Sequence, residues 1–192
     1  TNSDGTTTDL SSESGAFQQW ELICNQPPAA PPAGASPPSA PPRPSCWTAG
    51  DVLIRISDDA DPEDRAFLST NNDGTSVDLW SSDTGDGNEH WTLTHVSGDT
   101  YTIKTAGVPT DLIYLNTGAQ GLLIDLWSDN TTGNQEWIIT DVGDTGLVTI
   151  QTAGTPTDRV FLSTNYGGSE LKLWNNASSN EQWEVVCLQP PS

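Results

Sequence analysis

The sequence has few basic residues and no methionine, and the shortage of positive charge narrows its possible partners. Only 6 lysines and arginines stand against 26 acidic residues, so the formal net charge is −20. Nucleic acids and anionic membrane surfaces both attract lysine and arginine, so neither is an expected partner. No stretch approaches the roughly 20 consecutive apolar residues that cross a bilayer, and membrane insertion is not expected either. A strongly acidic surface instead favours solubility and the binding of cations.

A segment of about 47 residues occurs three times in the chain. Three sets of aromatic residues recur at intervals of 46 or 47: Phe67, Tyr114 and Phe161; Trp80, Trp127 and Trp174; and Trp91, Trp137 and Trp183. One such repeat cannot bury its own apolar face, whereas three together can share a core. The repetition therefore predicts one domain built from three equivalent units.

The two tryptophans of each repeat are predicted to have different environments. In the segment 77–80, Val77 and Leu79 alternate with Asp78 and Trp80, so one face of this strand is apolar and the other polar. The segments 124–127 and 171–174 alternate in the same way. Because the polar face must contact solvent, the tryptophans that end these segments are predicted to be partly exposed. The later tryptophans stand in apolar sequence and are predicted to lie in the core.

Short alternating strands, separated by glycine, asparagine and aspartate turns, predict an all-β fold. Three copies fit a closed threefold barrel with a hairpin cap. Each repeat carries a Leu-Trp and then ends in Gln-x-Trp or a close variant. The motif is exact at 18–20 and 135–137, whereas 89–91 and 181–183 have glutamate in place of glutamine. In these features the chain resembles the ricin B-chain-like β-trefoil family of lectins, which implies a β-trefoil.

The N-terminal residues match the end of the third repeat. Thr1–Cys24 aligns without a gap to Thr164–Cys187, at an offset of 163 residues. Either the polypeptide continues upstream, or this segment completes a neighbouring subunit by strand addition; we favour the first, because residues 46–187 already hold three repeats. Proline, alanine and serine dominate residues 26–45, which predicts an extended linker of the polyproline II type. The expected organisation is the end of a preceding trefoil (1–25), a linker (26–45), a complete trefoil (46–187, with repeats at about 46–96, 97–142 and 143–187) and the start of another linker (188–192).

The three cysteines fit this organisation. Because the chain ends meet in a threefold barrel, Cys46 and Cys187 are predicted to form a disulfide. Cys24 is the counterpart of Cys187, so its partner is expected upstream or in another molecule. Disulfides persist in oxidising compartments, so we expect an extracellular or cell-surface protein.

The resemblance to lectins implies a sugar site in each repeat. Such a site combines an early aspartate, an aromatic platform, and a later asparagine next to a glutamine. The platform maps to Trp80, Trp127 and Trp174, and the asparagine to Asn88, Asn134 and Asn180. Ser69, Asn116 and Ser163 replace the early aspartate. The best-preserved set is Asn116, Trp127, Asn134 and Gln135. Alternatively, the tryptophans form contacts between modules and the asparagines hold turns.

Other candidate sites are few. An acidic loop contains Asp58, Asp59, Asp61, Glu63 and Asp64. Hard cations bind clustered oxygen ligands, so this loop is either a calcium site or a solvated acidic loop; no other cofactor is expected. Asn130 and Asn176 begin N-glycosylation sequons. No nucleophile motif or metal-ligand spacing accompanies His90 and His95, so we expect no enzymatic activity.

Two functional hypotheses follow from the sequence. The first is a non-catalytic structural module, one bead of an extracellular tandem array or filament with an adhesive role, whose partners are neighbouring copies. The alternative is a secreted carbohydrate-binding module, alone or appended to an enzyme, whose partners are glycans. A protease inhibitor is a weaker third option, because no protruding reactive loop stands out.

Overall fold

A computed structural model describes residues 43–57, 66–71, 76–107, 111–118, 123–154, 160–164 and 170–188. The chain divides into the units Thr1–Pro41 and Pro42–Ser192, and everything below concerns the second unit. The predicted trefoil end and most of the linker lie outside the described residues, as does Cys24. The five acidic residues of the candidate calcium loop also lie outside them.

The described part of the chain is almost entirely β-structure, as predicted. Its strands are β1 (Asp51–Ile56), β2 (Phe67–Thr70), β3 (Val77–Trp80), β4 (His90–Ser97), β5 (Thr100–Thr105), β6 (Tyr114–Thr117), β7 (Ile124–Trp127), β8 (Glu136–Asp141), β9 (Val148–Thr152), β10 (Phe161–Thr164), β11 (Leu171–Trp174) and β12 (Gln182–Cys187). The helical elements are α1 (Cys46–Ala49) and the 3-10 helix η2 (Ser179–Glu181).

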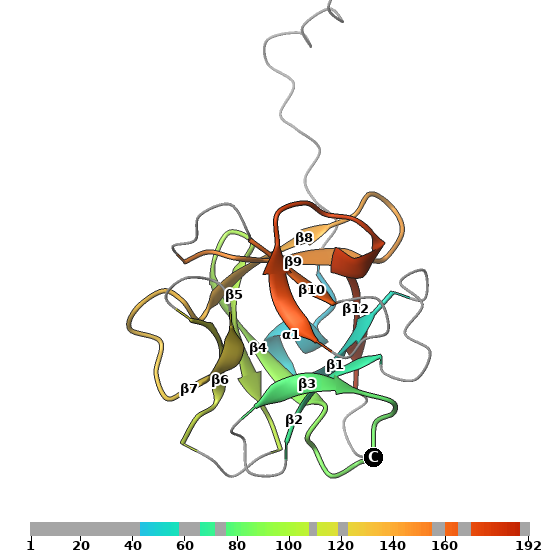
Figure 1. The fold of residues 1–192 in the computed structure, drawn as a ribbon. Coiled ribbons are helices and arrows are strands. Elements are labelled where there is room, and N and C mark those ends of the chain that lie inside the picture. Colours follow the sequence, from blue (N-terminus) through green and yellow to red (C-terminus); the bar gives the residue numbers. More distant parts are fainter. Residues whose placement is uncertain are drawn as a thin grey trace, which may run out of the picture. The chain divides into compact units, whose positions relative to one another are not determined.

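Six of the strands close into a barrel. The antiparallel order runs β1, β4, β5, β8, β9, β12 and back to β1. The hairpins β2–β3, β6–β7 and β10–β11 branch from this barrel, and their strands β3, β7 and β11 contact one another. Figure 1 shows the three hairpins arranged around one centre. The closed barrel with a hairpin cap confirms the predicted architecture.

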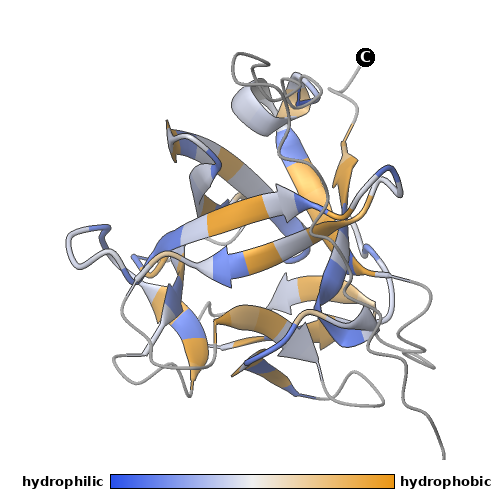
Figure 2. Ribbon diagram, turned by 90° about the horizontal axis from the view of Figure 1, so that it is seen from above, coloured by the Kyte–Doolittle hydropathy of each residue, from blue (hydrophilic) through white to orange (hydrophobic). Residues whose placement is uncertain are grey.

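The core follows the alternation of the strands. The tryptophans of the later motif, Trp91, Trp137 and Trp183, are each 0% exposed. The tryptophans that end β3, β7 and β11 are 43%, 47% and 38% exposed, at Trp80, Trp127 and Trp174. Both predictions about the tryptophans are therefore confirmed. Figure 2 shows hydrophilic and hydrophobic residues alternating along the strands, and most of the hydrophobic ones are buried.

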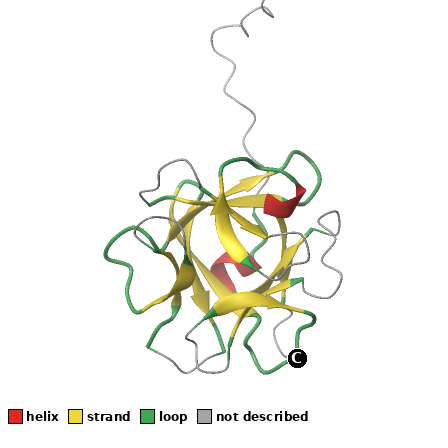
Figure 3. Cartoon of the chain, viewed as in Figure 1, coloured by secondary structure: helices red, strands yellow, loops and turns green. Residues whose placement is uncertain are grey.

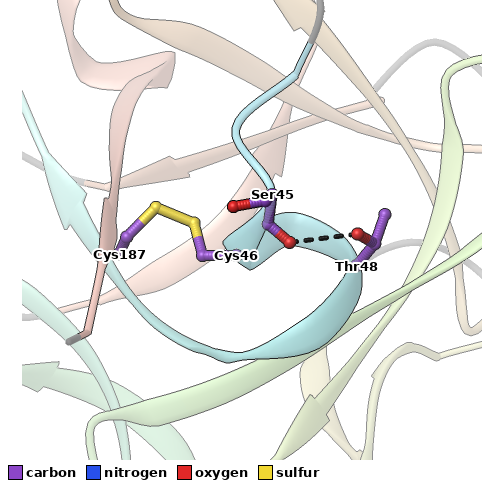
Figure 4. The surroundings of a disulfide bond; sticks show 4 residues. All are labelled: Ser45, Cys46, Thr48 and Cys187. Carbon is purple, nitrogen blue, oxygen red and sulfur yellow. Dashed lines mark hydrogen bonds between the residues drawn. A yellow bond between two sulfur atoms is a disulfide. The ribbon is translucent and has the colours of Figure 1, made fainter. Parts of the chain in front are cut away.

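The short helix α1 was not predicted from the sequence. It lies in the middle of the ring of strands in Figure 3 and contacts β1 and β4. Its Trp47 is buried and packs edge-on against Tyr101, with ring centroids 5.7 Å apart. Cys46, the first residue of α1, forms the predicted disulfide with Cys187 of β12 (Figure 4). Among the described residues, no helix has the length and apolar character needed to cross a membrane.

Candidate functional site

The Gln-x-Trp-like motif fixes the end of each repeat to the first strand of its hairpin. In the first repeat, the indole N–H of Trp91 donates to the carbonyl oxygen of Leu68 at 2.8 Å. The backbone N–H of Thr70 donates to the carbonyl oxygen of Asn88 at 3.0 Å. The indoles of Trp137 and Trp183 donate in the same way, each at 3.0 Å. These bonds hold the residues before each tryptophan against the hairpin.

Between these two bonds lies a buried polar pair. The hydroxyl of Ser69 donates to Glu89 Oε1 at 2.9 Å, and both residues are almost fully buried. In the third repeat the hydroxyl of Ser163 donates to Glu181 in the same way. Ser69 and Ser163 stand where the lectins have their early aspartate, and Glu89 and Glu181 stand where they have glutamine. A hydrogen bond therefore joins these two motif positions in both repeats.

The second repeat makes the equivalent pair from two amides. The side-chain amide of Gln135 donates to Asn116 Oδ1, and both residues are almost fully buried. The amide nitrogen of Asn116 then donates to Asp125 Oδ1 at 2.6 Å. Asn116 and Gln135 of the best-preserved set therefore do lie together, with Trp127 exposed nearby on the strand of Asp125.

The second strand of each hairpin places a charged residue opposite the pair. Register pairing sets Asp78 opposite Ser69, Asp125 opposite Asn116, and Lys172 opposite Ser163. Each charged residue stands two positions before the exposed tryptophan of its strand, so both side chains share one face. An acidic group is therefore next to the platform in the first two repeats, and a basic group in the third.

The first repeat contains a cavity of about 610 Å³. It is lined by Ser69, Thr70, Asn71, Asp78, Trp80, Thr84, Asp86, Asn88 and Glu89. Backbone N–H donation from Asn88, together with a side-chain hydrogen bond from Thr84, lowers the pKa of Asp86 below its ordinary value. The cavity thus combines an exposed aromatic face with three acidic side chains and two asparagines.

The third repeat has a smaller cavity, of about 220 Å³. Its lining includes Lys172, Trp174, Asn180 and Glu181. The ammonium nitrogen of Lys172 lies 5.1 Å from the centroid of the Trp174 ring, within range of a cation–π interaction. The platform of this repeat is therefore already in contact with a cation.

Solved structures with this architecture are numerous. ThreeFoil, a designed threefold symmetric protein, has a TM-score of 0.56 at 20% identity and covers 72% of this chain and 99% of that chain. SeviL, bound to the asialo-GM1 saccharide, has a TM-score of 0.55 at 14% identity, and the match covers 73% of this chain and 98% of SeviL. Polyporus squamosus lectin, bound to the epitope Neu5Aca2-6Galb1-4GlcNAc, has a TM-score of 0.54 at 21% identity, and the match covers 72% of this chain and 49% of the lectin. The chain has the β-trefoil fold. No family model and no curated protein matches it.

Close packing between consecutive repeats of the trefoil positions the candidate asparagines. A Cβ atom on Gly107 would lie 2.4 Å from the carbonyl oxygen of Gly87, the residue before Asn88. A Cβ on Gly154 would lie 2.8 Å from Asn134 Oδ1. Only glycine permits such contact. The loops that carry Asn88 and Asn134 are therefore each held by the following repeat.

The asparagines of the two predicted glycosylation sequons do not line the cavities, unlike Asn88 and Asn180. Asn176 is exposed, whereas Asn130 is half-buried and its Oδ1 is buried without a hydrogen-bond partner in the described structure. Asn88, Asn134 and Asn180 are all half-buried. Within the part of the chain that the structure describes, no three histidine, cysteine or acidic side chains are placed to hold a metal ion.

Sequence reasoning missed the residues that charge the cavities, above all Asp78, Asp125 and Lys172. The alternation already placed Asp78 and Trp80 on one face of a strand. Pairing Phe67 with Trp80 across the hairpin would also have placed Asp78 opposite Ser69. The prediction lacked the register between the two strands of each hairpin, which a comparison of the repeats does not provide.

Proposed function

We propose that this trefoil is a non-catalytic carbohydrate-binding module whose tryptophans at 80, 127 and 174 are the sugar platforms. The observation that carries the proposal is the half-exposed Trp80 beside fixed polar groups in a cavity of about 610 Å³. A flat aromatic face can pack against the C–H groups of a sugar ring, while asparagine and carboxyl oxygens accept hydrogen bonds from its hydroxyls. The glycan complexes of SeviL and Polyporus squamosus lectin support the same class of ligand.

The polar pairs support the proposal because they pre-organise the cavity. Glu89 accepts from the Ser69 hydroxyl and, at 3.4 Å, from the backbone N–H of Thr84. These bonds hold the carboxyl group before a ligand arrives, which lowers the entropy cost of binding. The Cys46–Cys187 disulfide supports an extracellular location, where glycans of cell surfaces and matrices are available.

Replacing Trp80 with alanine is expected to weaken binding to the first repeat by about 30-fold, which corresponds to the loss of roughly 2 kcal/mol typical of a central anchor. Trp80→Phe keeps a flat ring and should retain most of the affinity. A glycan panel identifies the ligand, and isothermal titration calorimetry compares the variants, with circular dichroism confirming that each one folds. The proposal fails if the native protein binds no glycan, or if Trp80→Ala, Trp127→Ala and Trp174→Ala all bind as tightly as the native protein.

A second candidate, one bead in an extracellular tandem array, is favoured by two observations. Residues 1–24 repeat residues 164–187 at an offset of 163. In addition, Arg43 at the end of the predicted linker is fixed to the barrel. Its guanidinium donates to the carbonyl oxygen of Ile139 at 2.8 Å, pairs with Asp141, and lies 4.5 Å from the Trp47 ring. The last residues of the predicted linker are therefore fixed to the trefoil that follows them.

The mass of the native polypeptide under denaturing, reducing conditions tests the array. We expect a mass far above 20.5 kDa, increased by whole modules of about 163 residues. A native mass of 20.5 kDa would eliminate a covalent array. Carbohydrate binding is independent of this result, because one bead can carry complete cavities.

A further inference from the structure

The cavities of the first and third repeats differ in charge at the same position. In the first repeat, Asp78, Asp86 and Glu89 line the cavity, and its described lining includes no lysine or arginine. In the third repeat, Lys172 occupies the position that corresponds to Asp78. The hydrogen bonds that hold Ser69 to Glu89 and Ser163 to Glu181 are nevertheless alike. The difference therefore lies in the side chains that a ligand would meet, while the framework is the same.

We infer that the cavity of the first repeat selects a sugar that carries a protonated amine, such as a hexosamine unit without its acetyl group. This inference rests on the proposed carbohydrate binding and names the ligand class of that site. A protonated amine offers three N–H donors and a positive charge, whereas an N-acetyl group offers one donor and no charge. Acidic side chains form their strongest hydrogen bonds with charged donors.

The arrangement around Trp80 suits such a ligand. Asp78 shares the strand face of Trp80, so a ring stacked on the indole would bring its substituents near this acid. The indole face itself attracts cations. The hydrogen bond from Asn88 that lowers the pKa of Asp86 keeps this carboxyl group charged to lower pH than usual.

The third repeat has the opposite preference. The ammonium group of Lys172, 5.1 Å from the Trp174 ring, occupies the approach that an amino group of a ligand would take. An amino group of a ligand over the same ring would be repelled by this like charge. One module therefore contains a platform that favours a cationic sugar and another that disfavours it.

Calorimetric titration with a glucosamine trimer and with its N-acetylated counterpart tests the inference on the full chain. We expect the amine form to bind at least tenfold more tightly at low salt, and the preference to shrink as salt screens the charges. Asp86→Asn should reduce the affinity for the amine form about tenfold and leave the N-acetylated form unchanged. The matched control is Asp99→Asn, which removes one exposed acid outside the cavity lining and should change neither affinity.

Three results would overturn the inference. Equal affinity for the two trimers would remove the amine preference while leaving carbohydrate binding in place. If the amine form still binds to the Trp80→Ala variant, or if putrescine competes for the site as well as the sugar does, the binding is only the attraction of any cation to an acidic protein. If neither trimer nor any other glycan binds in a way that depends on Trp80, Trp127 or Trp174, the proposed function itself fails.

Discussion

Replacing Trp137 with alanine is expected to lower the free energy of unfolding by about 3–5 kcal/mol, the range for truncating a large buried aromatic residue. The side chain is 0% exposed and its indole N–H donates to the carbonyl oxygen of Leu115 at 3.0 Å. The substitution therefore leaves a cavity in the core and a buried carbonyl oxygen without its partner. Trp137→Phe keeps much of the ring and should cost less. Urea denaturation followed by circular dichroism measures the change.

The same repeat supplies the matched control. Trp127 is 47% exposed, so Trp127→Ala removes less buried surface and should cost well under half as much as Trp137→Ala. A comparable loss of stability in both variants would contradict the assignment of one tryptophan to the core and the other to a binding surface. The pair also separates stability from ligand binding, because only Trp127 is available to a ligand.

The sequence was sufficient to predict the fold because its repeats carry the framework residues in phase. The recurrence of Trp91, Trp137 and Trp183 marks the indole-to-carbonyl bond that fixes each hairpin to the barrel. Strand alternation correctly separated these tryptophans from the exposed ones. By contrast, α1 has only four residues, too few to show a helical period, and it was not predicted.

The candidate site was only partly predictable, because its chemistry depends on pairs of residues. Taken alone, Ser69 looked like the loss of a lectin aspartate. In the structure Ser69 is one half of a bonded pair with Glu89, and an acidic group, Asp78, stands opposite it on the neighbouring strand. The second repeat uses an amide pair for the same purpose. Residue-by-residue comparison with a motif cannot detect such joint changes.

The division between framework and site explains how the repeats can differ in charge without losing the fold. The indole of each core tryptophan donates to the backbone of the first hairpin strand, so this bond does not involve the charged residue of the second strand. Asp78 and Lys172 instead lie on the face of the exposed tryptophans. A charge reversal there leaves the core contacts unchanged. Three equivalent positions can therefore serve three different ligands on one scaffold.

Removing the Cys46–Cys187 disulfide is expected to cause a comparably large loss of stability. The bond joins residues 141 positions apart. In the chain-entropy model, a cross-link over so long a loop stabilises by about 4–5 kcal/mol, because it restricts the unfolded chain. In the folded state the chain ends are also held by β1 and β12, which pair from Val52↔Cys187 to Ile56↔Trp183. The variant with Cys46→Ser and Cys187→Ser should therefore fold to the same trefoil but unfold at a lower urea concentration.

Urea denaturation of the native protein with and without a reductant measures this effect. Cys24→Ser is the control, because Cys24 takes no part in the Cys46–Cys187 bond, and its unfolding midpoint should match that of the native protein. Ligand affinity at Trp80 should be the same in the reduced and oxidised proteins at low urea, since the cavity is built by β2, β3 and the residues that precede β4. An unchanged midpoint on reduction would show that the pairing of β1 with β12 suffices, and that the disulfide contributes nothing to equilibrium stability.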